Sequence, residues 1–262
     1  MAGAYTHYTA ANAVLSQKPD WAERVLPYLP LYYFGAQGAD FCFFYPVFKD
    51  YKKLINFGSY LHKEGGYDAF CVCKAFATEK PLFAYVMGYI THYAVDITFH
   101  PYIYAKSGKS PLIHHAAENA LDSHFLHHFA LSAPTSTFGQ TPEKRHIQSL
   151  FSLYFAIAAN AGFPPLSKSA FFRAVKVFNA YLPLPKGLFG QTDGAVARAL
   201  ANVENEPWKH PQTGKEYRLG ASELMQNSIE RSLALCQSFI CCQKHKEPLS
   251  KAAFGKNYTS GL

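Results

Sequence analysis

The chain has 262 residues, enough to bury one large hydrophobic core without disulfides or a structural metal. Hydrophobic residues make up 49% of the sequence and charged residues 16%, which excludes an intrinsically disordered protein. The formal net charge of +7 weakly favours an anionic substrate, nucleic acid or an acidic lipid surface. No secretory signal is evident, and the most apolar stretch (81–99) carries His92 and Asp96 at its middle. We therefore expect a cytoplasmic protein.

Helical periodicity dominates the sequence, and glycine- and proline-rich segments separate the periodic stretches. The fold class predicted is all-α, a compact multi-helix bundle. Residues 206–220 are expected to form an exposed loop or a short hairpin, and Pro101 is expected to end the fifth helix. The predicted helices cover residues 5–17, 22–34, 47–62, 66–77, 79–100, 110–131, 142–160, 166–182, 193–207 and 220–243.

Ten of the twelve histidines precede residue 147, and the composition of the chain changes near residue 132. We expect residues 1–131 to form a helical core that carries a site. Residues 132–262 are expected to add helices packed on that core, within the same domain.

The first three candidates lie at the ends or starts of predicted elements. His7 lies on the same face of the first helix as Ala11 and Val14. Asp40 follows two glycines in FGAQGAD, where a tight turn can direct its side chain inward, although an Asp there can also cap the next helix. His62 ends the helix 47–62 beside a pair of glycines. None of these positions is informative alone.

The helix 79–100 carries the strongest signal, because His92, Asp96 and His100 are four residues apart. This spacing places all three side chains on one face of a helix that is otherwise apolar. Burial of such groups costs several kcal/mol unless they are compensated. The alternatives are a metal site and a set of hydrogen-bonded core histidines, and the shared stripe favours metal because imidazole and carboxylate are common zinc ligands.

The helix 110–131 adds a second ligand pair. His114 and Glu118 are four residues apart and can bind one metal together. His115 and Asp122 form a second stripe, offset from the first. If His115 rather than His114 faces the site, the predicted register is wrong by one residue.

The ordered series of these motifs resembles the bacterial zinc-dependent phospholipase C family. The series runs from an early T-H through G-x-x-G-x-D and G-x-x-x-H to H-x-x-x-D-x-x-x-H-P-Y and H-x-x-x-E, over residues 4–130. That family shares an all-helical fold with the zinc-dependent single-strand nucleases. The resemblance therefore implies the same fold and a metal-dependent phosphoester hydrolase.

Carried over by position, the resemblance implies a cluster of two to three zinc ions. The first would be held by Asp40, His62, His92 and Asp96, with Asp40 also taking a proton from the attacking water. The second would be held by His100, His114 and Glu118. The third would be held by His7, with Asp96 as the bridging carboxylate. In the family, the third metal also takes the amine and carbonyl of a processed N-terminal residue, which is a tryptophan in the secreted enzymes. The chain departs from the family here, because its tryptophans are Trp21 and Trp208 and only six residues precede His7.

Such a cluster lowers the pKa of a bound water and neutralises charge that builds on a phosphate group. The expected substrate is a phosphoester, such as a phospholipid headgroup reached at a transient membrane surface, with nucleic acid as the alternative. Phe44, Tyr45 and Tyr93 are candidate pocket residues, although such aromatic residues are more often core. A nuclease or phosphomonoesterase of the same fold, and a non-catalytic metal-bearing binding module, remain open. The sequence indicates no protein partner.

Overall fold

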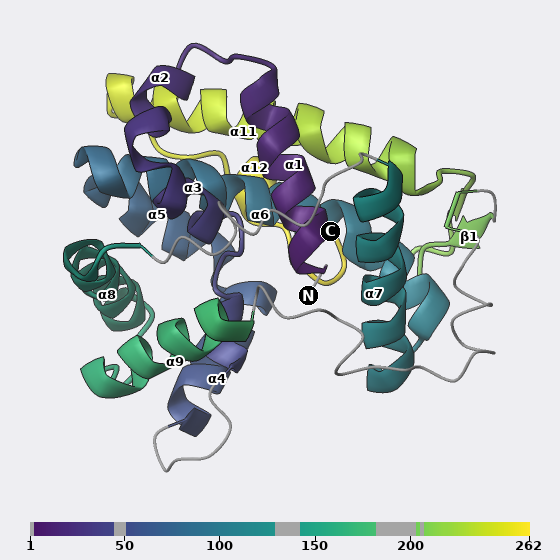
Figure 1. Cartoon of the computed structure of the whole chain (residues 1–262), viewed down its shortest axis with the longest axis horizontal. Coiled ribbons are helices and arrows are strands. Elements are labelled where there is room, and N and C mark those ends of the chain that lie inside the picture. Colours follow the sequence, from purple (N-terminus) through teal and green to yellow (C-terminus); the bar gives the residue numbers. More distant parts are fainter. Residues whose placement is uncertain (1–2, 45–50, 129–141, 182–202, 205–206) are drawn as a thin grey trace.

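The computed structural model describes residues 3–44, 51–128, 142–181, 203–204 and 207–262. These residues are almost entirely helical, which confirms the predicted all-α bundle, and the one sheet among them is a two-stranded hairpin (Figure 1). In chain order the elements are α1 (Ala4–Ser16), α2 (Ala22–Val25), η1 (Leu26–Tyr28), α3 (Leu29–Gly35), η2 (Asp40–Phe43), α4 (Tyr51–Lys63), α5 (Gly66–Phe76), α6 (Lys80–Ser107), α7 (Pro111–His128), α8 (Lys144–Asn160), α9 (Lys168–Tyr181), β1 (Trp208–Lys209), β2 (Glu216–Tyr217), α11 (Ala221–His245) and α12 (Lys251–Phe254).

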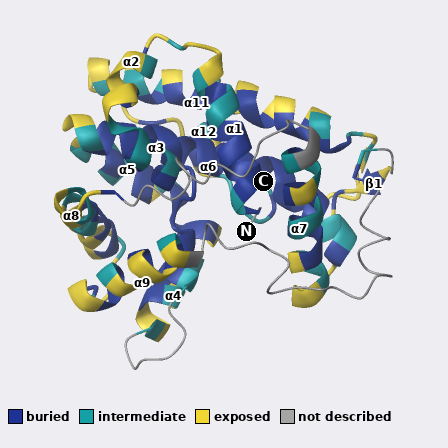
Figure 2. Ribbon diagram, in the orientation of Figure 1, coloured by how far each residue is buried: buried dark blue, intermediate teal, exposed yellow. Residues whose placement is uncertain are grey.

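Helix α6 is the centre of the core. It spans 28 residues and is buried along almost its whole length (Figure 2). Helices α1, α2, α3, α5, α7, α8 and α11 all pack against it. A helix that is buried on every side needs such a cover, and this explains why α6 lacks a polar face exposed to solvent.

The closest of these contacts, between α3 and α6, fixes the loop that carries Asp40. A Cβ atom on Gly35 would lie 2.1 Å from the backbone oxygen of Tyr85, and one on Gly88 would lie 2.0 Å from that of Tyr32. The two helices therefore touch backbone to backbone, which only glycine permits. The chain leaves α3 directly over α6 and reaches Asp40 within five residues of Gly35.

The predicted end of the helix 79–100 is wrong. Helix α6 continues through Pro101 to Ser107 and ends at Gly108, whose φ of +55° suits glycine. Proline removes only one backbone N–H, and the carbonyl it leaves, that of Ile97, lies against Gly261 from the end of the chain. Tertiary packing thus carries the helix two turns past the expected stop.

Other boundaries differ less. The helix predicted over 22–34 is divided into α2, η1 and α3, because Pro27 and Pro30 interrupt the hydrogen-bond ladder. The hairpin expected within 206–220 is confirmed, with Trp208 paired to Tyr217. Most of the helix predicted over 193–207 lies outside the described residues. The four-residue helix α12 was not predicted.

Helices from both halves of the sequence share one core. Helix α8 packs against α5, and α11 packs against α1 and α6. The division at residue 131 stays a prediction. Within the described parts of the chain, none of the helices combines the length and apolar character needed to span a membrane.

Candidate metal centre

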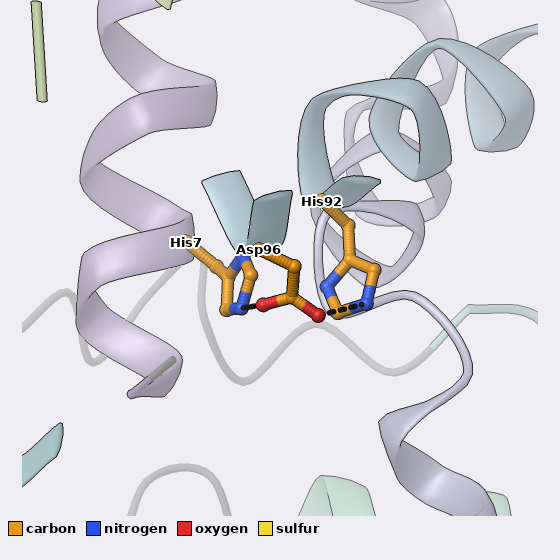
Figure 3. Close-up of side chains that lie close together, drawn as sticks. All are labelled: His7, His92 and Asp96. Atoms are coloured by element: carbon orange, nitrogen blue, oxygen red, sulfur yellow. Dashed lines mark ion pairs between the residues drawn. The ribbon is translucent and has the colours of Figure 1, made fainter. Parts of the chain in front are cut away.

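The carboxylate of Asp96 lies at the centre of the site, between histidines of two helices. Its Oδ1 is 3.3 Å from Nε2 of His7 on α1, and its Oδ2 is 3.3 Å from Nε2 of His92 on α6 (Figure 3). All three side chains are fully buried. The two carboxylate oxygens therefore face different imidazoles, which is the arrangement that a bridging carboxylate needs.

The polar atoms of these three residues have no hydrogen-bond partner among the described residues. This holds for both ring nitrogens of His7, both ring nitrogens of His92 and both oxygens of Asp96. Buried polar atoms in native proteins are almost always paired, so this concentration in one place requires an explanation. The donor set of imidazole nitrogen and carboxylate oxygen fits a divalent metal such as zinc.

Asp40 and His62 form the second part of the site. Nε2 of His62 lies 3.1 Å from Oδ1 of Asp40, while its Nδ1 lies 2.7 Å from the backbone oxygen of Gly58. Because a carbonyl only accepts, Nδ1 of His62 carries a proton, and because a carboxylate also only accepts, Nε2 donates to Asp40 when no metal is bound. Burial lowers the pKa of His62, but the hydrogen bond and the charge of Asp40 outweigh it and raise that pKa, so zinc would have to displace the Nε2 proton. The same Oδ1 of Asp40 is 3.9 Å from Nε2 of His92.

Gly38 brings the Asp40 loop onto α6. Its φ is +58°, and a Cβ atom there would lie 2.1 Å from Cδ2 of the His92 ring. The backbone oxygen of Gly38 accepts hydrogen bonds from the hydroxyls of Tyr85 and Tyr154, at 3.4 Å and 3.5 Å. These contacts from α6 and α8 hold the turn at the distance that places Asp40 beside His92.

A third group joins α6 to α7. Nε2 of His114 lies 2.9 Å from Oε1 of Glu118, and the rings of His100 and His114 stack with centroids 5.7 Å apart. The neighbouring His115 side chain is 69% exposed and contacts Oε2 of Glu118 through its Nδ1 at 3.2 Å. His114 therefore faces the group while His115 lies on its outer side, in the predicted register.

Burial governs the protonation of the histidines on α6. It lowers the pKa of His92 to about 4 and that of His100 to about 3, against the opposing charge of Asp96. Burial also raises the pKa of Asp96, but the neighbouring histidines outweigh this and hold it well below its usual range. At neutral pH the stripe thus consists of neutral imidazoles and a carboxylate, which are the protonation states that bind metal.

Together these residues form three groups, and within each group the donor atoms lie within 4.8 Å of one another. The groups contain every residue predicted as a metal ligand: His7, His92 and Asp96; Asp40, His62 and His92; His100, His114 and Glu118. Three of the eight lie on α6, and the others come from α1, η2, α4 and α7.

A family model described as zinc dependent phospholipase C matches residues 6–163, more than half of the chain. The chain belongs to the zinc-dependent phospholipase C family. Zinc is accordingly the metal expected at the three groups, and all eight of their residues fall within the matched region. Searches of the curated proteins and of the solved structures gave no match.

Two of the three aromatic residues predicted to line a substrate pocket, Phe44 and Tyr93, are among the described residues. Tyr93 is fully buried, packs against Phe70 and donates its hydroxyl to the backbone oxygen of Ala253. Phe44 packs against Phe178 on α9, with ring centroids 4.9 Å apart. Tyr45 lies outside the described residues. These contacts are typical of packing residues, the alternative that the sequence also allowed, and the pocket role stays a prediction.

An open cavity of about 600 Å³ lies at the α6 end of the third group. The Tyr104 side chain forms part of its wall, and the same ring lies 4.8 Å from the ring of His114 between centroids. The described residues that line it are Pro101, Tyr104, Gly108, Lys109, His210, Pro211, Gln212, Thr259 and Ser260. Among these described residues Lys109 is the one lysine or arginine, and there is no aspartate or glutamate.

Sequence reasoning missed the supporting residue Tyr258. Its backbone oxygen lies 3.0 Å from Nδ1 of His100, and its backbone N–H donates to the oxygen of His62 at 3.0 Å. Both contacts use backbone atoms, which every residue type supplies, so no sequence signal marks the position.

Proposed function

We propose that this chain is a zinc-dependent phosphoester hydrolase of the phospholipase C type. The observation that carries the proposal is the carboxylate of Asp96, fully buried and facing His7 with one oxygen and His92 with the other, none of these polar atoms being hydrogen-bonded among the described residues. Membership of the zinc-dependent phospholipase C family supports the same reading.

Zinc bound at these groups would lower the pKa of a bound water and neutralise the charge that builds on the phosphate oxygens. The side chains of the chain itself have distinct parts in this proposal. Asp96, with one oxygen toward His7 and the other toward His92, would hold zinc together with these histidines, and His100, His114 and Glu118 would hold a further ion. Burial excludes bulk water from most of these side chains, so their dipoles and charges are weakly screened.

Asp40 is the proposed general base. Its Oδ1 lies 3.1 Å from Nε2 of His62, and the side chain is held in a buried turn beside His92. A carboxylate that contacts the ligand shell is within reach of a water bound there, which is the first requirement of a general base.

The cavity beside Tyr104 bears on the choice of substrate. A quaternary ammonium group is usually held by aromatic faces, often with an acidic neighbour. The described lining offers one tyrosine, no carboxylate and the positive charge of Lys109. This favours an anionic or hydroxyl-rich group on the substrate over a choline group.

Hydrolysis assays on the zinc-loaded protein test the proposal. The panel is phosphatidylcholine, phosphatidylglycerol, single-stranded DNA and a phosphomonoester, each with and without a chelator. We expect zinc-dependent release of the phosphorylated headgroup, faster from phosphatidylglycerol. Cleavage of DNA alone would indicate the nuclease alternative, which the net charge of +7 favours. Tightly bound zinc with no turnover of any of the four would show a non-catalytic binding module and sink the proposal.

A further inference from the structure

The residues 255–262, which follow α12, lie against two histidines of the metal centre. This segment returns to the middle of the molecule and reaches α6, where Gly261 lies against the backbone of Ile97 (Figure 1). It lies outside residues 6–163, the part that matches the family model. Its contacts with the two histidines therefore come from a part of the chain that the family model does not cover.

Tyr258 is the point of contact. Its backbone N–H donates to the backbone oxygen of His62 at 3.0 Å, and its backbone oxygen lies 3.0 Å from Nδ1 of His100. Its ring, 1% exposed, packs against the His62 ring with centroids 5.1 Å apart. One residue thus touches a candidate ligand from each of two separate groups.

The contact with His100 decides which ring nitrogen carries the proton. A carbonyl oxygen only accepts, so Nδ1 of His100 donates and Nε2 keeps the lone pair. Hydrogen bonds of this kind to backbone carbonyls orient metal-binding histidines, and their loss typically weakens metal binding about 10- to 100-fold.

The segment is held in shape by Asn257. Its Oδ1 accepts from the N–H of Thr259 at 2.8 Å, from the hydroxyl of Thr259 at 2.6 Å and from the N–H of Ser260 at 3.2 Å. Its Nδ2 donates to the backbone oxygen of Lys63 at 2.9 Å, next to His62. At the far end, the backbone oxygen of Ser260 lies 3.0 Å from Nε2 of His210 in the hairpin turn.

We propose that residues 255–262 act as a clamp that positions His62 and His100 for zinc, with Asn257 as its key positioning residue and Tyr258 as its contact. The proposal rests on the zinc cluster of the proposed function, but not on the reaction that the cluster performs. It predicts that zinc affinity depends on a residue that touches no metal.

Asn257→Ala tests the clamp because it removes all the bonds that Asn257 makes through its side chain. Asn257→Asp keeps the three bonds to Oδ1 but loses the donation to Lys63, so it should lie between Asn257→Ala and the natural protein. Ser250→Ala is the matched control: it removes the side chain that caps α12 through Ala253, in the same part of the chain, without contacting residues 255–262. Thr259→Val removes one hydroxyl bond and serves as a milder variant.

Zinc affinity by chelator competition is the first measurement. We expect Asn257→Ala to weaken at least one zinc site about tenfold or more, and Asn257→Asp and Thr259→Val to have smaller effects in the same direction. Ser250→Ala should bind zinc as the natural protein does. The second measurement is the ¹H–¹⁵N spectrum of the histidine rings, in which the protonated Nδ1 of His100 should shift most in Asn257→Ala and should not shift in Ser250→Ala.

Unchanged zinc affinity in both Asn257→Ala and Thr259→Val would overturn the clamp, whatever their activity. An equal loss of affinity in Ser250→Ala would also overturn it, because the effect would then follow from general destabilisation. If the protein binds zinc through the clamp but hydrolyses no phosphoester, the proposed function fails and the clamp stands.

Discussion

Asp122 of α7 holds the first turn of α1 through Thr6. Its Oδ1 accepts from both the backbone N–H and the hydroxyl of Thr6, each at 2.8 Å. Gly3 caps α1 without a side chain of its own, and a Cβ atom there would lie 2.1 Å from Oδ1 of Asp122. The capping oxygen is thus supplied by another helix, one that also carries His114 and Glu118. Since His7 follows Thr6 on α1, these bonds position His7 relative to the candidate ligands on the other helices.

Asp122→Ala should therefore displace His7. The change removes two hydrogen bonds to a buried carboxylate, for which we expect a loss of about 2–3 kcal/mol in the free energy of unfolding. We also expect the variant to retain less zinc than the natural protein, measured by elemental analysis after dialysis. Asp122→Asn keeps an oxygen acceptor for Thr6 and should lie between the two. Full zinc retention in Asp122→Ala would show that His7 does not need this bond.

Gly38→Ala should weaken zinc binding as well as lower the stability of the protein. Alanine at a positive φ costs about 1–2 kcal/mol, and here its methyl group would also overlap the ring of His92. Gly162→Ala is a matched control, because Gly162 has φ +71° and a Cβ atom there would meet no other atom within 4 Å. We expect both variants to lose stability in denaturant unfolding and only Gly38→Ala to lose zinc. Equal zinc content in both would contradict the assigned role of Gly38.

The candidate ligands could be predicted from the sequence because helix geometry makes their spacing meaningful. His92, Asp96 and His100 share a face of α6, and His114 and Glu118 share a face of α7, so four-residue spacing determined both sets. The order of the motifs along the chain, which resembles that of the family, then added Asp40, His62 and His7 to the candidate ligands. The end of α6 could not be predicted, because Pro101 is tolerated through packing against a segment more than 150 residues away.

The supporting contacts were less accessible to sequence reasoning. The sequence shows that Asp122 lies on the same predicted helix as His114. It does not indicate the partner of Asp122, because Thr6 lies 116 residues away. The contacts of Tyr258 with His62 and His100 use backbone atoms and carry no signal at all. Aromatic residues gave a weaker signal, since the same residue types pack in the protein interior: Tyr93 is buried against Phe70, and the half-buried Phe44 packs against Phe178.

The stability of the metal-free protein should fall as the pH decreases from about 6.5 to about 4. His92 in the unfolded chain takes up a proton near its ordinary pKa of 6.5, whereas in the folded protein burial holds its pKa at about 4. Within this range the unfolded state binds more protons, so acid favours unfolding. Urea unfolding of chelator-treated protein at several pH values measures this. His92→Gln, which cannot titrate, should show a shallower pH dependence. Identical slopes for the two proteins would contradict the depressed pKa.

Asp96→Asn should be the most damaging isosteric change in the molecule if Asp96 bridges metals. Asparagine keeps the volume and one oxygen, but its neutral amide cannot face His7 and His92 with two anionic oxygens. We expect the variant to lose bound zinc and phosphoester hydrolysis, even with excess zinc. The zinc-loaded natural protein should lose thermal stability when a chelator is added, because a metal bound only by the folded state stabilises it.

Asp68→Asn provides the control for that change, since Asp68 is an exposed aspartate on α5 whose carboxylate accepts a hydrogen bond from the hydroxyl of Tyr60. It should keep the zinc content, the activity and the response to chelator of the natural protein. The competing view, a core of hydrogen-bonded histidines, predicts a melting temperature that ignores chelator and a mild effect of Asp96→Asn. A protein with that behaviour, and with unchanged zinc content in Asp96→Asn, would show that the stripe on α6 is packing. The polar atoms of His7, His92 and Asp96 argue against this, because packing alone would leave three ionisable groups buried without hydrogen-bond partners among the described residues.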